Sequence, residues 1–263
     1  MPSRLCEYNE LLHLLMSNAY AFLTIREFAS RLIRSTSDFR GRIALLRHDV
    51  DSDLKTARAM FELEHKLGIR STYYFRLRTI DIPFMRELEK HGSEAGYHYE
   101  EIATFAKWRG IRTREGVSRR MSEVQGLFQA NLDRLRHQTG LPIRTIAAHG
   151  DFVNRVLQMT NAELLDANVR KNASIEAEAY DDAIESQFSM RISDAPPPFW
   201  WSPCDPRPHI KNGAEVLHIL LHPGQWRADP FANASQIWRR SVEGIAYWAK
   251  SRLLTDSASS TSR

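Results

Sequence analysis

The sequence predicts an α/β protein built around a mostly parallel sheet. Strand-like segments alternate with amphipathic helical segments from residue 43 onward, which is the pattern of repeated strand–helix–strand units. Several of these strands run into histidine or carboxylate side chains at their carboxyl ends, where parallel α/β folds place their active sites. The pattern leaves open whether the sheet is open and doubly wound or closed into a barrel.

The expected elements follow in order from hydrophobic periodicity and from helix start and stop signals. A helix around Leu11, a strand over 19–25 and a second helix account for the start of the chain. Asp53 is placed to cap the next helix and Gly68 to end it. Beyond residue 42 the expected strands are 43–50, 71–77, 94–100, 143–150, 187–195 and the first part of 215–226. The expected helices are 53–67, 82–92, 114–138 and 233–254. Residues 196–208 are expected to form a loop rich in proline and tryptophan.

Length, composition and charge restrict the class of protein. The chain has 263 residues, 43% hydrophobic and 26% charged, so we expect one domain over 1–254 and a disordered tail over 255–263. The net charge of +4 suits an anionic substrate and does not indicate nucleic acid. Two cysteines make neither a disulfide framework nor a zinc motif. Without a secretory signal or a membrane-length apolar segment, a cytoplasmic protein with no membrane span is expected; nothing indicates its oligomeric state.

The strand ends supply the candidate functional residues. Side chains two apart on a strand point the same way, so Asp49 and Asp51 should share a face with Arg47, and His98 should share one with Glu100. His149 and His222 end two further strands and can join them. Two carboxylates and several imidazoles around one site suit a metal ion with acid–base groups beside it. His48 and Val50 should point the other way and pack.

Read together, these segments resemble the polysaccharide deacetylase superfamily, also called the NodB-homology or carbohydrate esterase family 4 group. The resemblance is carried by "RHDVD" (47–51), "EAGYHYE" (94–100), "HG" (149–150), "SD" (193–194) and "LHP" (221–223). It is closest to a divergent branch with "RHDVD", associated with bacterial surface-polysaccharide biosynthesis. It implies a distorted (β/α)7-type barrel and a divalent metal, with zinc the expected ion.

The resemblance also implies roles for single residues. Asp49 matches the catalytic base and His222 the general acid. Asp51 and His98 match metal ligands. The second metal histidine of the family would fall four residues after the first, where this chain has Ile102. We expect His149 to supply the third ligand, with Glu100 as the alternative, and the remaining candidates to bind substrate or support these groups; they are Arg47, Glu100, Asp194 and Trp226.

The expected activity is therefore metal-dependent removal of an N-acetyl or related acyl group from a sugar. Because no export signal is seen, a nucleotide- or lipid-linked sugar of lipopolysaccharide O-antigen or capsule assembly is the expected substrate. Two alternatives stay open. One is an amidase acting on a non-sugar C–N bond. The other is a catalytically degenerate barrel that binds glycans, which the loss of one metal histidine at Ile102 would explain.

Overall fold

A computed structural model of the protein describes residues 4–34, 41–196 and 198–226, together with 238, 242, 245–247 and 249. The chain separates into two compact units. The first comprises residues 1–98, 134–147 and 174–228, and the second comprises 99–133, 148–173 and 229–263. Compactness does not decide whether the two units fold as one domain, so a single domain over 1–254 stays a prediction. The expected tail, 255–263, lies outside the described residues.

The strands form one nine-stranded sheet with the order β6-β5-β4-β3-β2-β9-β7-β8, and β1 pairs with β2 beside this path. The pairings with a defined register are parallel except β7 with β8, which is antiparallel. The mixed α/β class and the mostly parallel sheet are thus confirmed, while closure into a (β/α)7-type barrel stays a prediction. The strands are β1 Tyr20–Phe22, β2 Arg42–Val50, β3 Thr72–Phe75, β4 Glu94–Tyr99, β5 Thr145–Ala148, β6 Ala177–Glu178, β7 Met190–Asp194, β8 Trp201–Ser202 and β9 Val216–Leu221.

Helices connect most of these strands, and many begin at a side-chain cap. Asp53 accepts the Thr56 N–H at 3.0 Å, which confirms its predicted capping role. The helices and 3₁₀ turns are α1 Leu5–Ser17, α2 Ile25–Ile33, α3 Leu54–Lys66, η1 Leu77–Thr79, α4 Ile82–Lys90, α5 Glu101–Arg109, α6 Arg114–Ser118, α7 Met121–Thr139, α8 Phe152–Leu157, η2 Asn161–Leu164, α9 Ala167–Asn172, α10 Asp182–Glu185, α11 Pro206–Lys211 and α12 Pro223–Trp226. No helix among the described residues is long and apolar enough to cross a membrane.

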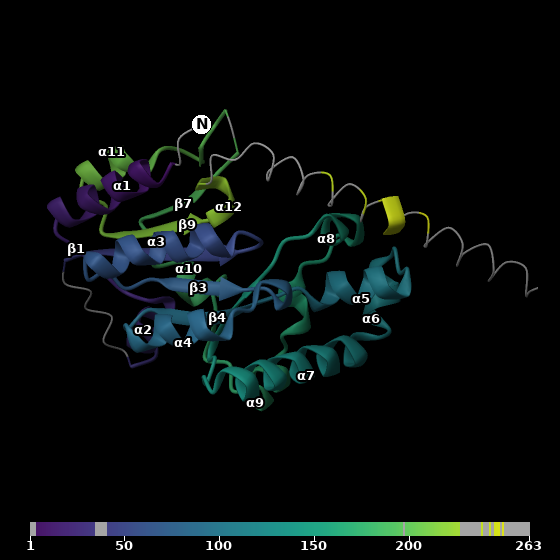
Figure 1. Ribbon diagram of the computed structural model, residues 1–263. Helices are drawn as coiled ribbons and strands as arrows, with labels where there is room; N and C mark the ends of the chain where they lie inside the picture. Colours follow the sequence, from purple (N-terminus) through teal and green to yellow (C-terminus); the bar gives the residue numbers. More distant parts are fainter. Residues whose placement is uncertain are drawn as a thin grey trace, which may run out of the picture. The chain divides into compact units, whose positions relative to one another are not determined.

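Strand β2 is central in the first unit and separates two apolar clusters. Ala44 and Leu46 belong to the cluster under α1 and α3, whereas Ile43 and Leu45 belong to the cluster on the opposite face. Figure 1 shows α1, α3, α11 and α12 close together, and these helices contact one another. This alternation continues along the strand and sends His48 to the first face and the 47/49 pair to the second.

The face of β2 toward α1 holds a buried polar cluster around Glu64 of α3. The Glu64 carboxylate accepts from His48 Nε2 at 2.6 Å, Ser71 Oγ at 2.5 Å and Tyr73 Oη at 2.9 Å, and it also accepts from the Tyr8 hydroxyl. Burial raises the pKa of Glu64, but the His48 charge and these hydrogen bonds lower it below the usual value. His48 is therefore a packing residue of the core, as predicted.

Two expected elements differ from the structure. The expected helix over 114–138 is divided into α6 and α7 by a turn, in which the Arg120 N–H bonds the Val117 carbonyl at 2.9 Å. The expected loop over 196–208 contains β8 and the start of α11, because Asp205 caps that helix through the Arg207 N–H and Pro206 occupies its first turn. The expected helix over 233–254 is described at only a few positions.

Candidate metal and acid–base site

Asp49 and Arg47 form a buried ion pair at the carboxyl end of β2. Arg47 Nε lies 2.8 Å from Asp49 Oδ1 and its Nη2 lies 2.9 Å from Oδ2, so the guanidinium grips both carboxylate oxygens. Burial by itself would raise the pKa of Asp49, but the Arg47 charge, helped by His98 and His222, holds it below its usual value. Asp49 is thus ionised at neutral pH, as the sequence predicts.

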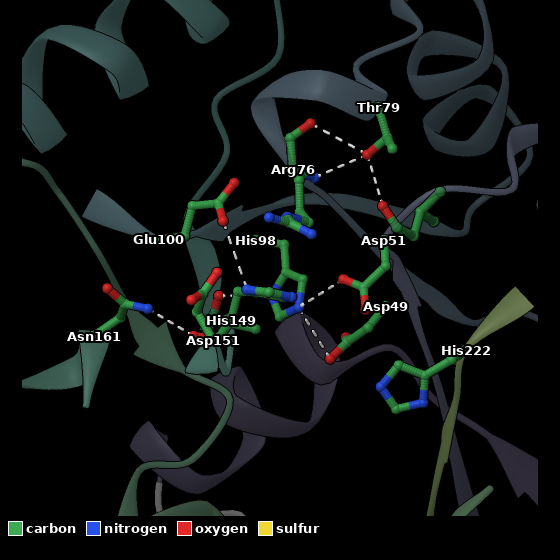
Figure 2. Close-up of polar contacts among 12 residues, drawn as sticks. Asp49, Asp51, Arg76, Thr79, His98, Glu100, His149, Asp151, Asn161 and His222 are labelled. Atoms are coloured by element: carbon green, nitrogen blue, oxygen red, sulfur yellow. Dashed lines mark hydrogen bonds and ion pairs between the residues drawn. The ribbon is translucent and has the colours of Figure 1, made fainter. Parts of the chain in front are cut away.

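His98 of β4 faces Asp49 and Asp51 (Figure 2). Its Nε2 lies 3.3 Å from Asp49 Oδ2 and 3.7 Å from Asp51 Oδ1. The other ring nitrogen, Nδ1, donates to the Ala147 carbonyl at 2.9 Å. This hydrogen bond places the proton on Nδ1 and fixes the ring, which is how proteins usually orient a metal-binding imidazole.

These separations suit a shared cation. Two ligand atoms about 2.0–2.1 Å from a tetrahedral zinc ion lie about 3.3 Å apart, and the 3.3 and 3.7 Å separations around His98 Nε2 are of this size. The 3.7 Å separation is too long for a hydrogen bond. Asp51 and His98, an acidic residue and a histidine, are donors that zinc accepts. These two residues of the first unit therefore fit a divalent metal, whereas Asp49 is already held by Arg47 through both carboxylate oxygens.

His222 follows β9 and is held by Asp194 of β7. Its Nδ1 donates to Asp194 Oδ1 at 2.6 Å, and its backbone N–H donates to Oδ2 at 2.7 Å. Trp226 Nε1 donates to the same Oδ2 at 2.8 Å. Burial would lower the pKa of His222, but Asp194, together with Asp49 and Asp51, raises it to about 9. His222 is protonated at neutral pH, and its side chain keeps 27% exposure, through which it can reach a substrate.

Tyr180 completes the support of the Arg47 guanidinium and was not anticipated from the sequence. Arg47 Nη2 donates to the Tyr180 hydroxyl at 3.0 Å, and the guanidinium carbon lies 4.4 Å from the centre of the Tyr180 ring. A lone tyrosine after a short strand carries no recognisable signal. Only the fold shows that it lies against β2.

The second unit contains its own group of candidate ligands. One ligand atom from each of Glu100, His149 and Asp151 lies within 4.8 Å of the other two, so this group can hold a metal ion. His149 Nδ1 is 3.6 Å from Glu100 Oε2 (Figure 2). Asp151 is already engaged, because it accepts from Lys107 Nζ at 2.8 Å and from the Val153 N–H at 2.9 Å.

The structure distributes the predicted residues between the two units. Asp49, Asp51, His98 and His222 belong to the first, with Arg47, Asp194 and Trp226 as their supports. Glu100 and His149 belong to the second. The assignment of His149, or of Glu100, to the same metal as Asp51 and His98 stays a prediction. Ile102 is fully buried in α5, so the position of the missing histidine is a core position.

Asp151 and Lys107 were also missed, and here a signal existed. Asp151 directly follows the "HG" pair and precedes α8, so it reads as a helix cap. That role is real, since the Asp151 carboxylate caps α8. Its place beside His149 follows from the same position in the chain.

Comparison with known proteins does not extend this description. No protein-family model matches the chain, and no curated protein matches it.

Proposed function

We propose that the protein is a metal-dependent hydrolase that removes an N-acetyl or related acyl group from a sugar. The observation that carries this proposal is the arrangement in the first unit. An ionised base, Asp49, lies beside His98, which together with Asp51 could hold zinc, and a protonated acid, His222, is held separately by Asp194. The resemblance of the strand-end motifs to polysaccharide deacetylases supports the same reading.

Asp51 and His98 would hold the metal, and His149 is the predicted third ligand. When bound, a divalent metal supplies Lewis acidity that polarises an acyl carbonyl and acidifies the attacking water. That chemistry suits this chain, because a carboxylate with a lowered pKa is a weak base. Arg47 orients the Asp49 carboxylate and keeps it ionised, ready to accept the proton of water at an oxygen.

His222 would deliver a proton to the departing amine. An amide nitrogen is a poor leaving group unless it is protonated as the C–N bond breaks. The Nδ1 atom of His222 is bound to Asp194, so Nε2 is the atom that can donate. Because Asp194 holds the pKa of His222 at about 9, His222 is already protonated before the substrate binds. The proposed pair thus has base and acid in opposite protonation states at the same pH.

The substrate we propose is a nucleotide- or lipid-linked sugar of O-antigen or capsule assembly. The net charge of +4 suits such anionic carriers. A degenerate glycan-binding protein is the second candidate, favoured by the buried Ile102 in place of a ligand. An amidase with a non-sugar substrate is chemically equivalent at the reacting bond, and a substrate panel separates the two.

The Asp49→Asn variant tests the assignment of roles. It should lower acetate release from N-acetylated nucleotide sugars or oligosaccharides by about 10²–10⁴-fold, because it removes the base. Its metal content, measured by elemental analysis, should stay that of the wild type, because Asp51 and His98 are unchanged. Loss of the metal together with activity would show that Asp49 is a ligand and that the roles of the two aspartates are exchanged.

A further inference from the structure

The aromatic run Phe199–Trp200–Trp201 is divided by the structure into a buried and an exposed part. Trp201 is 7% exposed and contacts the Trp226 ring edge-on, with the ring centres 5.6 Å apart. Phe199 is 78% exposed and Trp200 is 39% exposed. A run of three aromatic residues can serve as core, as an interface or as a surface for sugar rings. Only Trp201 takes the core role, so the neighbouring pair needs another explanation.

The exposed pair lies next to the carboxylate that holds His222. It occupies the turn between β7 and β8, in which Asp194 is the antiparallel partner of Trp201. The Ala195 N–H donates to the Trp200 carbonyl at 2.9 Å and closes this turn. The two aromatic side chains are therefore attached to the carboxyl end of β7, one residue along the ladder from Asp194.

The Trp200 indole is held in place. The Arg4 guanidinium carbon lies 4.1 Å from the centre of the Trp200 ring and 4.5 Å from the centre of the Trp226 ring. The centres of the Trp200 and Trp226 rings are therefore separated by no more than the sum of these two distances. Trp226 in turn donates to Asp194. Trp200 has a φ of 58°, a left-handed backbone conformation that is strained for a bulky residue. An exposed indole that is already held in one position is preorganised for a ligand.

We propose that Phe199 and Trp200 bind a sugar ring, namely the pyranose next to the one whose acyl group is removed. This inference rests on the proposed function for the reaction beside it. Aromatic faces offer a flat apolar surface to the C–H face of a pyranose, and Phe199 and Trp200 present two exposed aromatic side chains at adjacent positions beside Asp194. Because the turn adjoins the His222 side of the site, the bound ring belongs to the part of the substrate that keeps the amine. Of the two carriers proposed above, the substrate is then the lipid-linked one, with a glycan of at least two sugars.

Binding of sugars to the full chain tests this site without requiring turnover. The probes are N-acetylglucosamine, its β-1,4-linked trimer and UDP-N-acetylglucosamine, followed by calorimetry. Trp200→Ala should weaken binding of the trimer by about tenfold, the effect of losing one aromatic contact. It should leave binding of the monosaccharide and of the nucleotide sugar unchanged. Phe199→Ala, at a fully accessible position, should also weaken the trimer alone.

Trp108→Ala is the matched control. Trp108 is 60% exposed, and the Arg109 guanidinium carbon lies 4.3 Å from its ring centre, but it belongs to the second unit. It should not change binding of any probe. Trimer binding that is equal in wild type and Trp200→Ala overturns the proposal, as does a wild type that does not bind the trimer. A nucleotide sugar that alone depends on Trp200 would identify a nucleobase site instead.

Three further outcomes bear on this inference, and the last two separate it from the proposed function. A concentration-dependent dimer, lost in both aromatic variants, would show that a second copy of the chain covers the pair and would overturn the sugar site. Trimer binding that depends on Trp200, in protein that releases no acetate, would retain the sugar site and reject the hydrolase. Acetate release by a protein whose trimer binding does not depend on Trp200 would retain the hydrolase and reject the sugar site.

Discussion

Two charged pairs prepare the first unit for acid–base chemistry. Arg47 lowers the pKa of Asp49 below its usual value, and Asp194 raises the pKa of His222 to about 9. Both shifts oppose the effect of burial, so each depends on nearby charges, among which Arg47 and Asp194 contribute most. At neutral pH the proposed base is ionised and the proposed acid is protonated, which is the combination that cleavage of an amide requires.

Asp194→Asn tests the His222 pair. Removing the negative charge should lower the pKa of His222 from about 9 toward its ordinary value of about 6.5. The imidazolium would then be lost at lower pH, so the alkaline limb of the pH–rate profile should move to lower pH. Titration of His222 by NMR measures the same shift directly and does not require activity.

The control for this titration is Trp226→Phe. This variant removes one hydrogen bond to Asp194 Oδ2 but keeps the carboxylate charge, so the pKa of His222 should not fall. A His222 pKa that stays near 9 in Asp194→Asn would contradict the electrostatic assignment. An equal fall in both variants would point to loosened packing rather than to lost charge.

At the scale of elements, β2 shows what could be predicted. Period-two alternation predicts that Arg47 and Asp49 share one face and that His48 turns to the other, and both predictions are confirmed. The partner of His48 could not be predicted. Glu64 lies 16 residues away on α3, and its periodicity there marks it only as a residue facing the core. Alternation fixes the direction of a side chain, but it does not identify what that side chain meets.

The close packing of β3, β4 and β5 explains why position 96 is a glycine. Gly96 pairs with Tyr74, and a Cβ at Gly96 would overlap the Tyr74 ring and lie 3.0 Å from the Thr145 carbonyl oxygen. Gly96→Ala should therefore lower the free energy of unfolding by about 1–3 kcal/mol through overpacking. Urea denaturation measures this change.

Gly126→Ala is the opposite case in the same experiment. Gly126 is exposed in α7, and a Cβ there meets nothing within 4 Å. Alanine should stabilise the helix by about 0.5–1 kcal/mol, because glycine is a poor helix residue. Destabilisation by both substitutions, or by neither, would contradict the close packing assigned to β4.

At the scale of the whole molecule, the sequence predicts that polar residues lie at the ends of particular strands. It does not predict which residues contact them. The motifs predict which strands carry chemistry, because active sites lie at the carboxyl ends of parallel strands. The Asp194–Trp226 contact and the Tyr180 support arise from segments distant in sequence. A single sequence holds no periodic signal for such contacts, since they depend on how the strands are ordered in the sheet.

We propose that the protein is a metal-dependent hydrolase. The most direct test is to measure the acetate that metal-stripped protein releases when zinc is added back. The stripped protein is titrated with zinc while acetate is measured over a panel of N-acetylated nucleotide sugars and oligosaccharides. Release should rise in proportion to bound zinc and stop on addition of a chelator. In Asp51→Ala and His98→Ala the titration should need much more zinc, because each variant removes a proposed ligand. No acetate from any substrate, with one equivalent of metal bound, would contradict the claim.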